Sequence, residues 1–450
     1  MRIVIIGAGE VGYHIAKTLS LENHEVTVVE RDEKTCQYVQ STLDVLTISG
    51  NGANISTLKE AGIQDTDMIV AVTGIDEVNM VACMTARQFG VSKKIARIRD
   101  VEYIKNSTLI KQQLGVDFVI NPEIATSREI VNLLESPVNV AQIQNFAEGK
   151  VQIFELKVKE DFPFIGRQLK DINLGRPTLI VAIYRKGEIV IPSGEEKILL
   201  EDNLYIVAGE EHFLKLDEIT GPHPVNIRNV MILGGSNIGI QTASILSRHG
   251  ISTKLIEANR EKCHILAQKL PDTLVINGDG TDVEILKSEG IGATDGFVAV
   301  TGDEETNILV SLLAKHLGSN KVIAKVDRSN YIPIVEKIGV DAVVDPRIIT
   351  TSSILRFIRK GEVVSLTLLK EGKAEIMELI AQPASKIINK PLRDAHLPKE
   401  CIIGAIVRGS QVIIPHGNDI IQPQDKVIVF TLPSSIKKIE RMFTGKQKVK

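Results

Sequence analysis

Short apolar runs rich in β-branched residues alternate with amphipathic stretches between Met1 and Pro137. The runs span residues 2–6, 25–29, 45–48, 68–72, 94–98 and 118–120. Unbroken runs of this length are typical of strands buried on both faces, and their alternation with helical stretches favours a parallel sheet covered by helices. The pattern therefore predicts a six-stranded, doubly wound α/β domain, followed by a helix that begins at Pro122 and ends before Pro137.

Residues 139 to 209 show a different pattern, in which short alternating runs are separated by glycine, proline and charged residues. These runs span 151–158, 178–184, 188–191 and 203–207. Short alternating runs interrupted by turn residues are typical of short strands joined by turns. We therefore expect a small β-rich α+β domain here, and the Gly-Pro-His-Pro run at 221–224 predicts a linker after it.

The whole pattern then starts again. An apolar run at 229–233 leads into a second glycine-rich turn at Gly234, displaced by 227 from Gly7 (234 minus 7). The matches that follow keep displacements of 223 to 228: Gly50 with Gly278, Asn79 with Asn307, Pro122 with Pro346, and Asp202 with Asp425. So many matches in register predict a tandem duplication with four domains, at residues 1–137, 138–221, 228–360 and 361–450.

A glycine-rich turn joins the first predicted strand to the first helix. It reads Gly7-Ala8-Gly9-Glu10-Val11-Gly12, which has the G-x-G-x-x-G spacing of dinucleotide-binding Rossmann domains. The glycines allow a tight bend, a close approach of the pyrophosphate and close packing of the helix, whose N-terminus offers N–H groups to phosphate. The turn predicts a nucleotide site.

Glu30 ends the second strand, displaced by 18 from Gly12 (30 minus 12). A carboxylate at this place can accept both ribose hydroxyls of NAD. It would repel the extra phosphate of NADP by a few kcal/mol, for a separation of about 4 Å and an effective dielectric of about 20. This favours NAD(H), although Arg31 leaves a second interpretation open, since it can lie against adenine or pair with a phosphate.

The second turn departs from this pattern at its second glycine. It reads Gly234-Gly235-Ser236-Asn237-Ile238-Gly239, and Glu257 is displaced by 227 from Glu30 (257 minus 30). Ser236 places a β-carbon where the pyrophosphate would approach, while its N–H and Oγ could still donate to phosphate. We expect nucleotide binding to be weakened at this second site rather than excluded.

Two further features lie at the carboxyl ends of the strands, where doubly wound folds bind ligands. Thr73-Gly74 and Thr301-Gly302 end the fourth strands, and we expect contacts to ribose or nicotinamide there; the alternative is an ordinary strand-to-helix turn. Arg97 lies in an otherwise apolar strand, so its charge needs a partner, either a nucleotide phosphate or a neighbouring acid. Its counterpart is Lys325.

The composition excludes several classes of function. The 53 basic and 56 acidic residues give a formal charge of -3, aromatic residues make up 4%, and tryptophan is missing, so nucleic acid is not an expected partner. The four cysteines lie far apart, without a C-x-x-C, which fits a reducing cytosol. No apolar run reaches the roughly 18 to 20 residues that span a bilayer, so a partner would hold the protein at a membrane.

No catalytic or metal-binding constellation is found in the sequence. The nine histidines are scattered, and the β-rich module at 139–209 stands where a dehydrogenase would have its substrate domain. Two hypotheses remain open. One is a nucleotide sensor without enzymatic activity, and the other is an NAD-dependent oxidoreductase with an unrecognised substrate site.

The chain resembles the TrkA-like regulatory subunits of Trk potassium-uptake systems, which consist of two tandem RCK units (a KTN plus a TrkA-C domain each). The resemblance covers essentially the whole chain, and the run NFAEGKV with the duplicated layout is its most specific part. It is carried by MRIVIIGAGEVG, VVERD, VAVTGIDEVNMVAC, IARIRD, INPE, NFAEGKV, MILGGSNIG, LIEANR and IIGAIVRG. Ser236 is the departure from the family pattern.

This resemblance implies a regulatory protein that binds NAD or NADH, with ATP or ADP as further ligands. It implies docking on a membrane-embedded Trk-type potassium transporter, as a peripheral subunit on the cytoplasmic face of the inner membrane. It also implies a homo-oligomeric ring of Rossmann domains, paired through helices near residues 101–111, with hinges near 136–137 and 360–361. Regulation of a potassium-efflux or other cation channel is the alternative within the same domain family.

Overall fold

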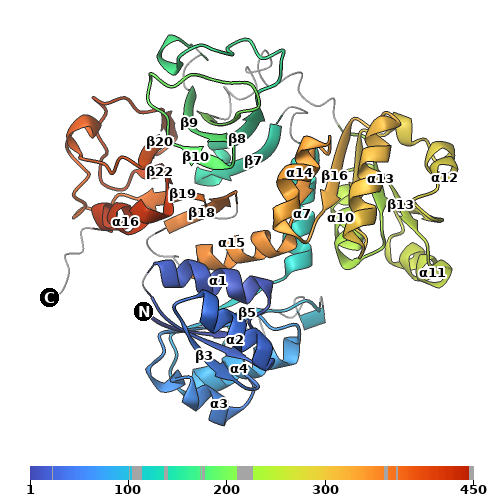
Figure 1. Cartoon of the computed structure of the whole chain (residues 1–450), viewed down its shortest axis with the longest axis horizontal. Coiled ribbons are helices and arrows are strands. Elements are labelled where there is room, and N and C mark those ends of the chain that lie inside the picture. Colours follow the sequence, from blue (N-terminus) through green and yellow to red (C-terminus); the bar gives the residue numbers. More distant parts are fainter. Residues whose placement is uncertain are drawn as a thin grey trace. The chain divides into compact units, whose positions relative to one another are not determined.

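The computed structural model describes residues 1–22, 24–100, 102–103, 114–135, 140–172, 174, 178–209, 227–358, 363–370 and 373–444. It confirms the predicted fold class, because the chain consists of two doubly wound parallel sheets, each followed by a smaller β-rich domain (Figure 1). The predicted linker at 221–224, both predicted hinges and most of the segment at 101–111 lie outside the described residues.

The first parallel sheet has the strand order β3-β2-β1-β4-β5-β6 of a Rossmann domain. Its central strand β1 (Arg2–Ile6) pairs with β2 and β4, and its last four residues are buried, which explains the unbroken apolar run. The other strands are β2 (Glu25–Glu30), β3 (Leu46–Ser49), β4 (Met68–Ala71), β5 (Lys93–Arg97) and β6 (Phe118–Ile120). The helices are α1 (Glu10–Leu21), α2 (Glu33–Thr42), α3 (Ile55–Glu60), α4 (Asp76–Gln88) and α7 (Pro122–Glu135).

The second parallel sheet repeats this order as β14-β13-β12-β15-β16-β17. Its strands are β12 (Asn229–Leu233), β13 (Ser252–Glu257), β14 (Thr273–Asn277), β15 (Gly296–Ala299), β16 (Lys321–Lys325) and β17 (Ala342–Val344). Its helices are α10 (Asn237–Arg248), α11 (Arg260–Lys269), α12 (Val283–Ser288), α13 (Glu304–His316), α14 (Ile332–Lys337) and α15 (Pro346–Ile358). The duplication read from the spacing of glycines is therefore a duplication of the fold.

The helix that closes each Rossmann half packs against the other half, which the sequence did not predict. Helix α15 packs against α1, and Phe357 stacks on Phe118 with ring centroids 4.6 Å apart. Conversely, Ser127 of α7 donates from Oγ to the carbonyl oxygen of Ile238 in α10 at 3.0 Å. By its contacts the chain forms two compact units, Met1–Ala125 with Pro346–Ile358, and Thr126–Asp345 with Arg359–Lys450.

The two small domains are antiparallel sheets of five strands with equivalent orders, β7-β8-β11-β9-β10 and β18-β19-β22-β20-β21. The first contains β7 (Val140–Phe146), β8 (Val151–Lys157), β9 (Thr178–Arg185), β10 (Glu188–Val190) and β11 (Asn203–Gly209). The second contains β18 (Val363–Leu369), β19 (Ala374–Ile380), β20 (Cys401–Arg408), β21 (Gln411–Ile413), β22 (Lys426–Thr431) and helix α16 (Ile436–Thr444).

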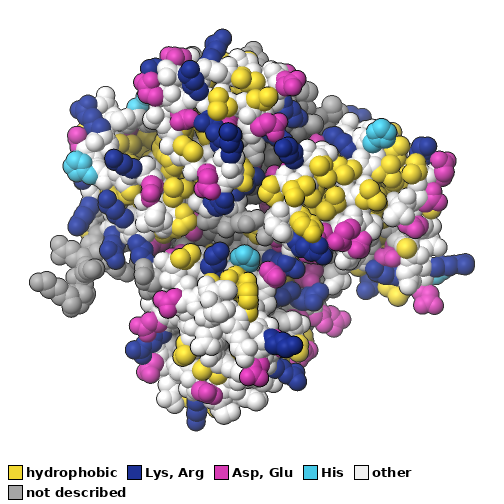
Figure 2. Space-filling model, viewed as in Figure 1, with side chains coloured by type: hydrophobic (Ala, Val, Ile, Leu, Met, Phe, Trp, Pro, Cys, Tyr) yellow, Lys and Arg dark blue, Asp and Glu magenta, His cyan; other side chains and the backbone are white. Residues whose placement is uncertain are grey.

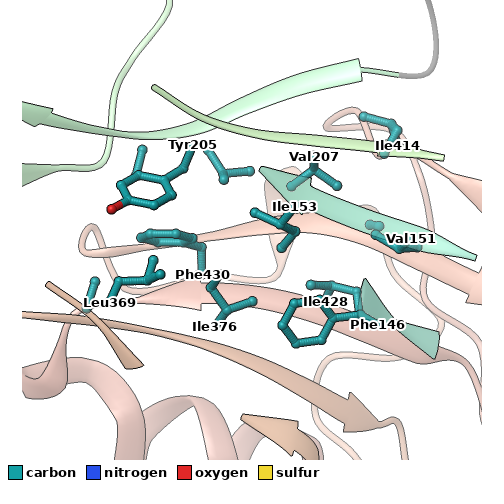
Figure 3. Close-up of a cluster of buried hydrophobic side chains, with 14 of the residues drawn as sticks. Phe146, Val151, Ile153, Tyr205, Val207, Leu369, Ile376, Ile414, Ile428 and Phe430 are labelled. Carbon is teal, nitrogen blue, oxygen red and sulfur yellow. The ribbon is translucent and has the colours of Figure 1, made fainter. Parts of the chain in front are cut away.

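These two sheets share one hydrophobic core. Figure 3 shows side chains from both domains pointing toward one another, among them Ile153 and Tyr205 from the first and Ile376 and Phe430 from the second. All four are almost fully buried. Because burial of such side chains contributes about 1.5–3 kcal/mol each, the small domains hold one another in place and form a single body.

Within the residues that the structure describes, none of the helices is both long and apolar enough to cross a membrane.

Candidate nucleotide sites

A pocket of about 600 Å³ opens at the carboxyl edge of the first parallel sheet. Its volume lies in the range of pockets that hold small ligands and cofactors. Of the residues singled out in the sequence, its lining contains Gly7, Gly9, Glu10, Val11, Glu30, Arg31, Thr73, Gly74 and Arg97. The other two, Ala8 and Gly12, are buried within the turn.

The three glycines of the turn have different surroundings. Gly7 has a φ of +98°, which L side chains rarely adopt, and a β-carbon on Gly12 would lie 1.9 Å from the carbonyl oxygen of Gly7. A β-carbon on Gly9 would meet nothing within 4 Å. Gly7 and Gly12 are therefore required by the fold, whereas Gly9 leaves space open in front of the helix N-terminus, where phosphate groups bind.

Glu30 is fixed at the end of β2 by backbone hydrogen bonds. Its Oε2 accepts from the N–H of Ala8 at 2.7 Å, and its Oε1 accepts from the N–H groups of Arg31 at 2.7 Å and Asp32 at 3.0 Å. The carboxylate thus ties the glycine-rich turn to the strand end. A carboxylate has about four acceptor sites, two on each oxygen, so Oε2 can still receive a ribose hydroxyl while Oε1 is fully engaged by the backbone.

Replacing Glu30 with alanine is expected to weaken adenine-nucleotide binding by about tenfold or more, because hydrogen bonds to a charged group contribute about 1.5–3 kcal/mol. The variant should also lose stability, since three backbone N–H groups lose their acceptor. Calorimetric titration measures the first effect and urea denaturation the second. Glu30→Gln, which keeps an acceptor oxygen, is the control. An unchanged affinity in both variants would contradict this placement of the ribose.

A buried asparagine joins the ends of β4 and β5. The Oδ1 of Asn79 accepts from the N–H and the hydroxyl of Thr73 at 2.9 and 2.7 Å, and its Nδ2 donates to the carbonyl oxygen of Arg97 at 2.8 Å. The second half repeats this arrangement around Asn307, which bonds Thr301 and the carbonyl oxygen of Lys325. The threonine hydroxyls therefore form hydrogen bonds within the turn itself. In each half the asparagine links this turn to the end of the neighbouring strand, beside the pocket.

Arg97 reaches the pocket from the end of β5. Burial lowers the pKa of its guanidinium, and the neighbouring charge of Arg99 lowers it further. Its Nε is buried and has no hydrogen-bond partner among the described residues. A buried N–H without an acceptor is costly, and an anion in the pocket would supply one. The counterpart Lys325 pairs with Asp327 at 2.6 Å, so in the second half the partner of this strand charge is a neighbouring acid.

The pocket also contains residues that the sequence did not indicate. Gly50, Asn51 and Gly52 follow β3 at the same sheet edge, and their repetition in the second half was a signal for them. Ile75, Val78 and Pro122 also line it, as do Pro346, Arg347 and Thr350 of α15. Nothing in the local pattern could have placed the α15 residues here, because only the exchange of helices brings them to the pocket.

The second pocket is smaller, about 330 Å³, and its lining differs in charge. Of the predicted residues, Gly234, Gly235, Ser236, Glu257, Thr301 and Gly302 line it, while Asn237, Ile238 and Gly239 form the first turn of α10. Asp279 and Asp303 face this pocket at the positions of Asn51 and Ile75, and Ala258 stands at the position of Arg31. These three residue differences make the second pocket more acidic than the first.

Ser236 and Glu257 are both engaged within the protein. The Ser236 hydroxyl donates to the carbonyl oxygen of Val300 at 2.6 Å and accepts from the N–H of Gly239. Its proton, which we expected to donate to a phosphate, is therefore already engaged in a hydrogen bond within the protein. Burial alone would raise the pKa of Glu257, but hydrogen bonds and charge from Lys262, 2.7 Å away, outweigh it and lower that pKa. This second site is thus less suited to a polyphosphate than the first.

Metal and thiol chemistry have little support in the described part of the chain. It contains no cluster of three or more His, Cys, Asp or Glu placed to hold a metal. All four cysteines are buried, and burial raises the pKa of Cys83 and of Cys401 to about 12. A thiol with so high a pKa is a poor nucleophile at neutral pH.

The fold and the first pocket define the class of protein: a duplicated Rossmann protein with a dinucleotide-type site. Models of the TrkA-N domain match residues 3–122 and 230–346, and models of the TrkA-C domain match residues 153–221 and 376–444. The chain belongs to the TrkA family.

Relatives of similar length agree with this assignment. The Trk system potassium uptake protein TrkA homolog 1 of Methanosarcina mazei is 38% identical over 451 residues, which cover 98% of this chain and 100% of the relative. The Trk system potassium uptake protein TrkA of Halomonas elongata is 34% identical over 452 residues, 98% of each chain.

Solved structures with the same fold include three of GsuK. The GsuK channel bound to NAD has a TM-score of 0.60 at 18% identity, over 99% of this chain and 79% of that one. The GsuK RCK domain has a TM-score of 0.60 at 19% identity, over 99% and 95%. GsuK bound to ADP has a TM-score of 0.52 at 15% identity, over 80% and 70%. At these identities the likeness concerns the fold.

Proposed function

We propose that this chain is a non-enzymatic regulatory subunit of a Trk-type potassium-uptake system, which binds NAD or NADH at its first pocket. The observation that carries the proposal is that pocket: an open Gly9 before a helix N-terminus, a Glu30 carboxylate anchored on the backbone, and an Arg97 whose Nε lacks an acceptor among the described residues. Family membership supplies the context, because the relatives are named as potassium uptake proteins.

The site residues and domain boundaries given in the sequence analysis are part of this proposal. ADP and ATP are further candidate ligands, since an adenine ribose and phosphates are common to all of them and GsuK structures are described with NAD and with ADP. The protein would act on the cytoplasmic face of the membrane, docked on a membrane-embedded potassium transporter. A nucleotide can bias that partner only by binding two arrangements of the regulator with different affinity.

We also propose that the chain forms a homo-oligomer through its Rossmann domains. Val81 and Met84 of α4 are partly exposed at 40% and 42%, and Leu309, displaced by 228 from Val81, is exposed at 64% on α13. Figure 2 shows hydrophobic side chains gathered over the surface that carries α13 and α14 in Figure 1. Exposed apolar patches of this kind mark protein contacts. Light scattering of the purified chain measures the assembly.

The test of the function combines binding with ion flux. Calorimetric titration of the full chain with NAD, NADH, ADP and ATP should give saturable binding, and the chain should co-purify with a polytopic membrane partner whose potassium flux changes with nucleotide. Oxidation of NADH across a panel of small acids and aldehydes tests the oxidoreductase alternative. Robust turnover that one side-chain change abolishes would overturn the regulatory proposal.

A further inference from the structure

Arg347 belongs to the second half of the chain by sequence but lines the pocket of the first half. It lies in the first turn of α15, next to Pro346 and one turn before Thr350, both of which also line that pocket. Its guanidinium lies 3.8 Å from the carboxylate of Glu10, the first residue of α1. The exchange of α15 therefore brings a cation to the helix N-terminus at which phosphates would bind.

The position of Arg347 counters an unfavourable charge. Glu10 stands directly beside Gly9, so its carboxylate would repel a phosphate that approaches the open glycine. Arg347 neutralises this charge and brings N–H donors in the planar arrangement that suits phosphate oxygens. With Arg31, Arg97 and Arg347 against Glu10 and Glu30, the first pocket has a formal charge of +1 (3 minus 2), and without Arg347 it would have none.

The second half offers an internal comparison. Its pocket is lined by residues from Leu233 to Thr306, with Lys262 against Glu257, Asp279 and Asp303, a formal charge of −2 (1 minus 3). The residue that corresponds to Arg347, displaced by 224, is Glu123, whose carboxylate binds Arg99 of the first half at 2.7 Å. The packing of α15 on the first half thus adds the cation Arg347 to the first pocket. At the equivalent position, the first half of the sequence has an acid, Glu123.

We propose that Arg347 is a phosphate-recognition residue of the first site, which makes this site select nucleotides with a di- or polyphosphate. The inference rests on the proposed function, since it concerns the same ligand. On binding, the guanidinium bonds both Glu10 and the phosphate. The chain before and after α15 belongs to the other compact unit, so a phosphate held by Arg347 would contact a helix of the second half of the sequence that packs in the first unit.

The experiment measures the affinity of the full chain for adenosine, ADP and NADH by calorimetric titration in wild type, Arg347→Gln and Arg347→Lys. Arg347→Gln should weaken ADP and NADH by about tenfold, as expected for a lost hydrogen bond to a charged group, and adenosine by less than about twofold. Arg347→Lys should restore most of the loss, because it keeps the charge. The salt dependence of ADP binding should become shallower in Arg347→Gln.

The matched control is Arg248→Gln, which removes an exposed arginine at the end of α10 that lines neither pocket. It should leave all three affinities unchanged. A wild-type chain that binds no nucleotide would overturn the proposed function itself. If wild type binds and Arg347→Gln behaves like Arg248→Gln, or loses adenosine as strongly as ADP, then the inference about Arg347 is wrong while the proposed function stands.

Discussion

Gly9→Glu is expected to reduce the affinity of the first site for NADH and ADP by at least about a hundredfold while the protein still folds. A β-carbon at Gly9 meets no atom within 4 Å, so the new side chain has space to leave the turn. It then places a carboxylate where the pyrophosphate would lie. At about 4 Å and an effective dielectric of about 20, two like charges repel by about 4 kcal/mol, or nearly a thousandfold, which solvent screening reduces.

Calorimetric titration measures this effect, and Gly302→Glu is the matched control. Gly302 lines the second pocket and, like Gly9, has no atom within 4 Å of an added β-carbon. The control introduces the same side chain, and affinity at the first site should not change. Far-ultraviolet circular dichroism of both variants should match the wild type. Wild-type affinity in Gly9→Glu would show that the nucleotide does not lie on the α1 N-terminus.

The turn around Gly9 could be predicted from the sequence because its requirements are local. A φ of +98° at Gly7 and the close approach of Gly12 to Gly7 demand glycine wherever this turn occurs. The position of Glu30 beside the turn follows similarly, since the end of β2 lies next to the turn in every sheet of this order, whereas its hydrogen bonds to the backbone are seen only in the structure. The duplication could be recognised for the same reason: these local requirements recur in a single register.

The exchange of α7 and α15 could not be predicted, because it is a choice between two tertiary arrangements with the same local pattern. Ile130 and Leu134 of α7 and Ile354 of α15 are fully buried. Their apolar spacing would be the same on a helix packed against its own sheet or against the other half. Arg347 was missed as a consequence, since its place in the pocket depends on this choice.

The shared core of the small domains was missed for a related reason. Alternating runs predicted short strands, but the pattern of a strand does not state which surface covers its sheet. In the structure the two sheets share one core, and the first sheet also packs on a second cluster of its own domain that includes Phe162 and Ile198. The structure also buries charged groups between the two sheets, among them Glu155 at 3% and Glu378 at 2% exposure. These acids lie in strands whose alternating pattern gave no indication of an ionic partner from a distant domain.

Lys370→Met is expected to destabilise the protein by about 3–5 kcal/mol, the cost of breaking a buried ion pair by removing one partner. Lys370, directly after β18, lies 2.7 Å from the carboxylate of Glu155 in β8 and 3.7 Å from that of Glu336 in α14. Burial would lower the pKa of Lys370, but both acids outweigh it and raise that pKa. Without this lysine, both carboxylates lose their shared cation, and with it the ion pairs that link the two small domains to each other and to the second Rossmann domain.

The loss should depend on pH with a definite sign. Burial already raises the pKa of Glu336, an effect that Lys370 opposes, so the variant raises the folded-state pKa of Glu336 further above its unfolded value. A raised carboxyl pKa makes stability fall as pH increases through it, hence the deficit of Lys370→Met should be small at about pH 4 and complete at about pH 7. Denaturation in urea at several pH values measures this.

Lys373→Met is the matched control, because Lys373 follows three positions later and makes an exposed pair with Glu188 at 3.6 Å. Surface pairs contribute little, typically about 0 to 1 kcal/mol, and their loss has no strong pH dependence near neutrality. Equal losses in the two variants, or a deficit of Lys370→Met that grows toward acid, would contradict the assigned role. A selective loss at neutral pH instead shows that Lys370 supplies a buried charge on which carboxylates of two other domains depend, in addition to the hydrophobic core that the small domains share.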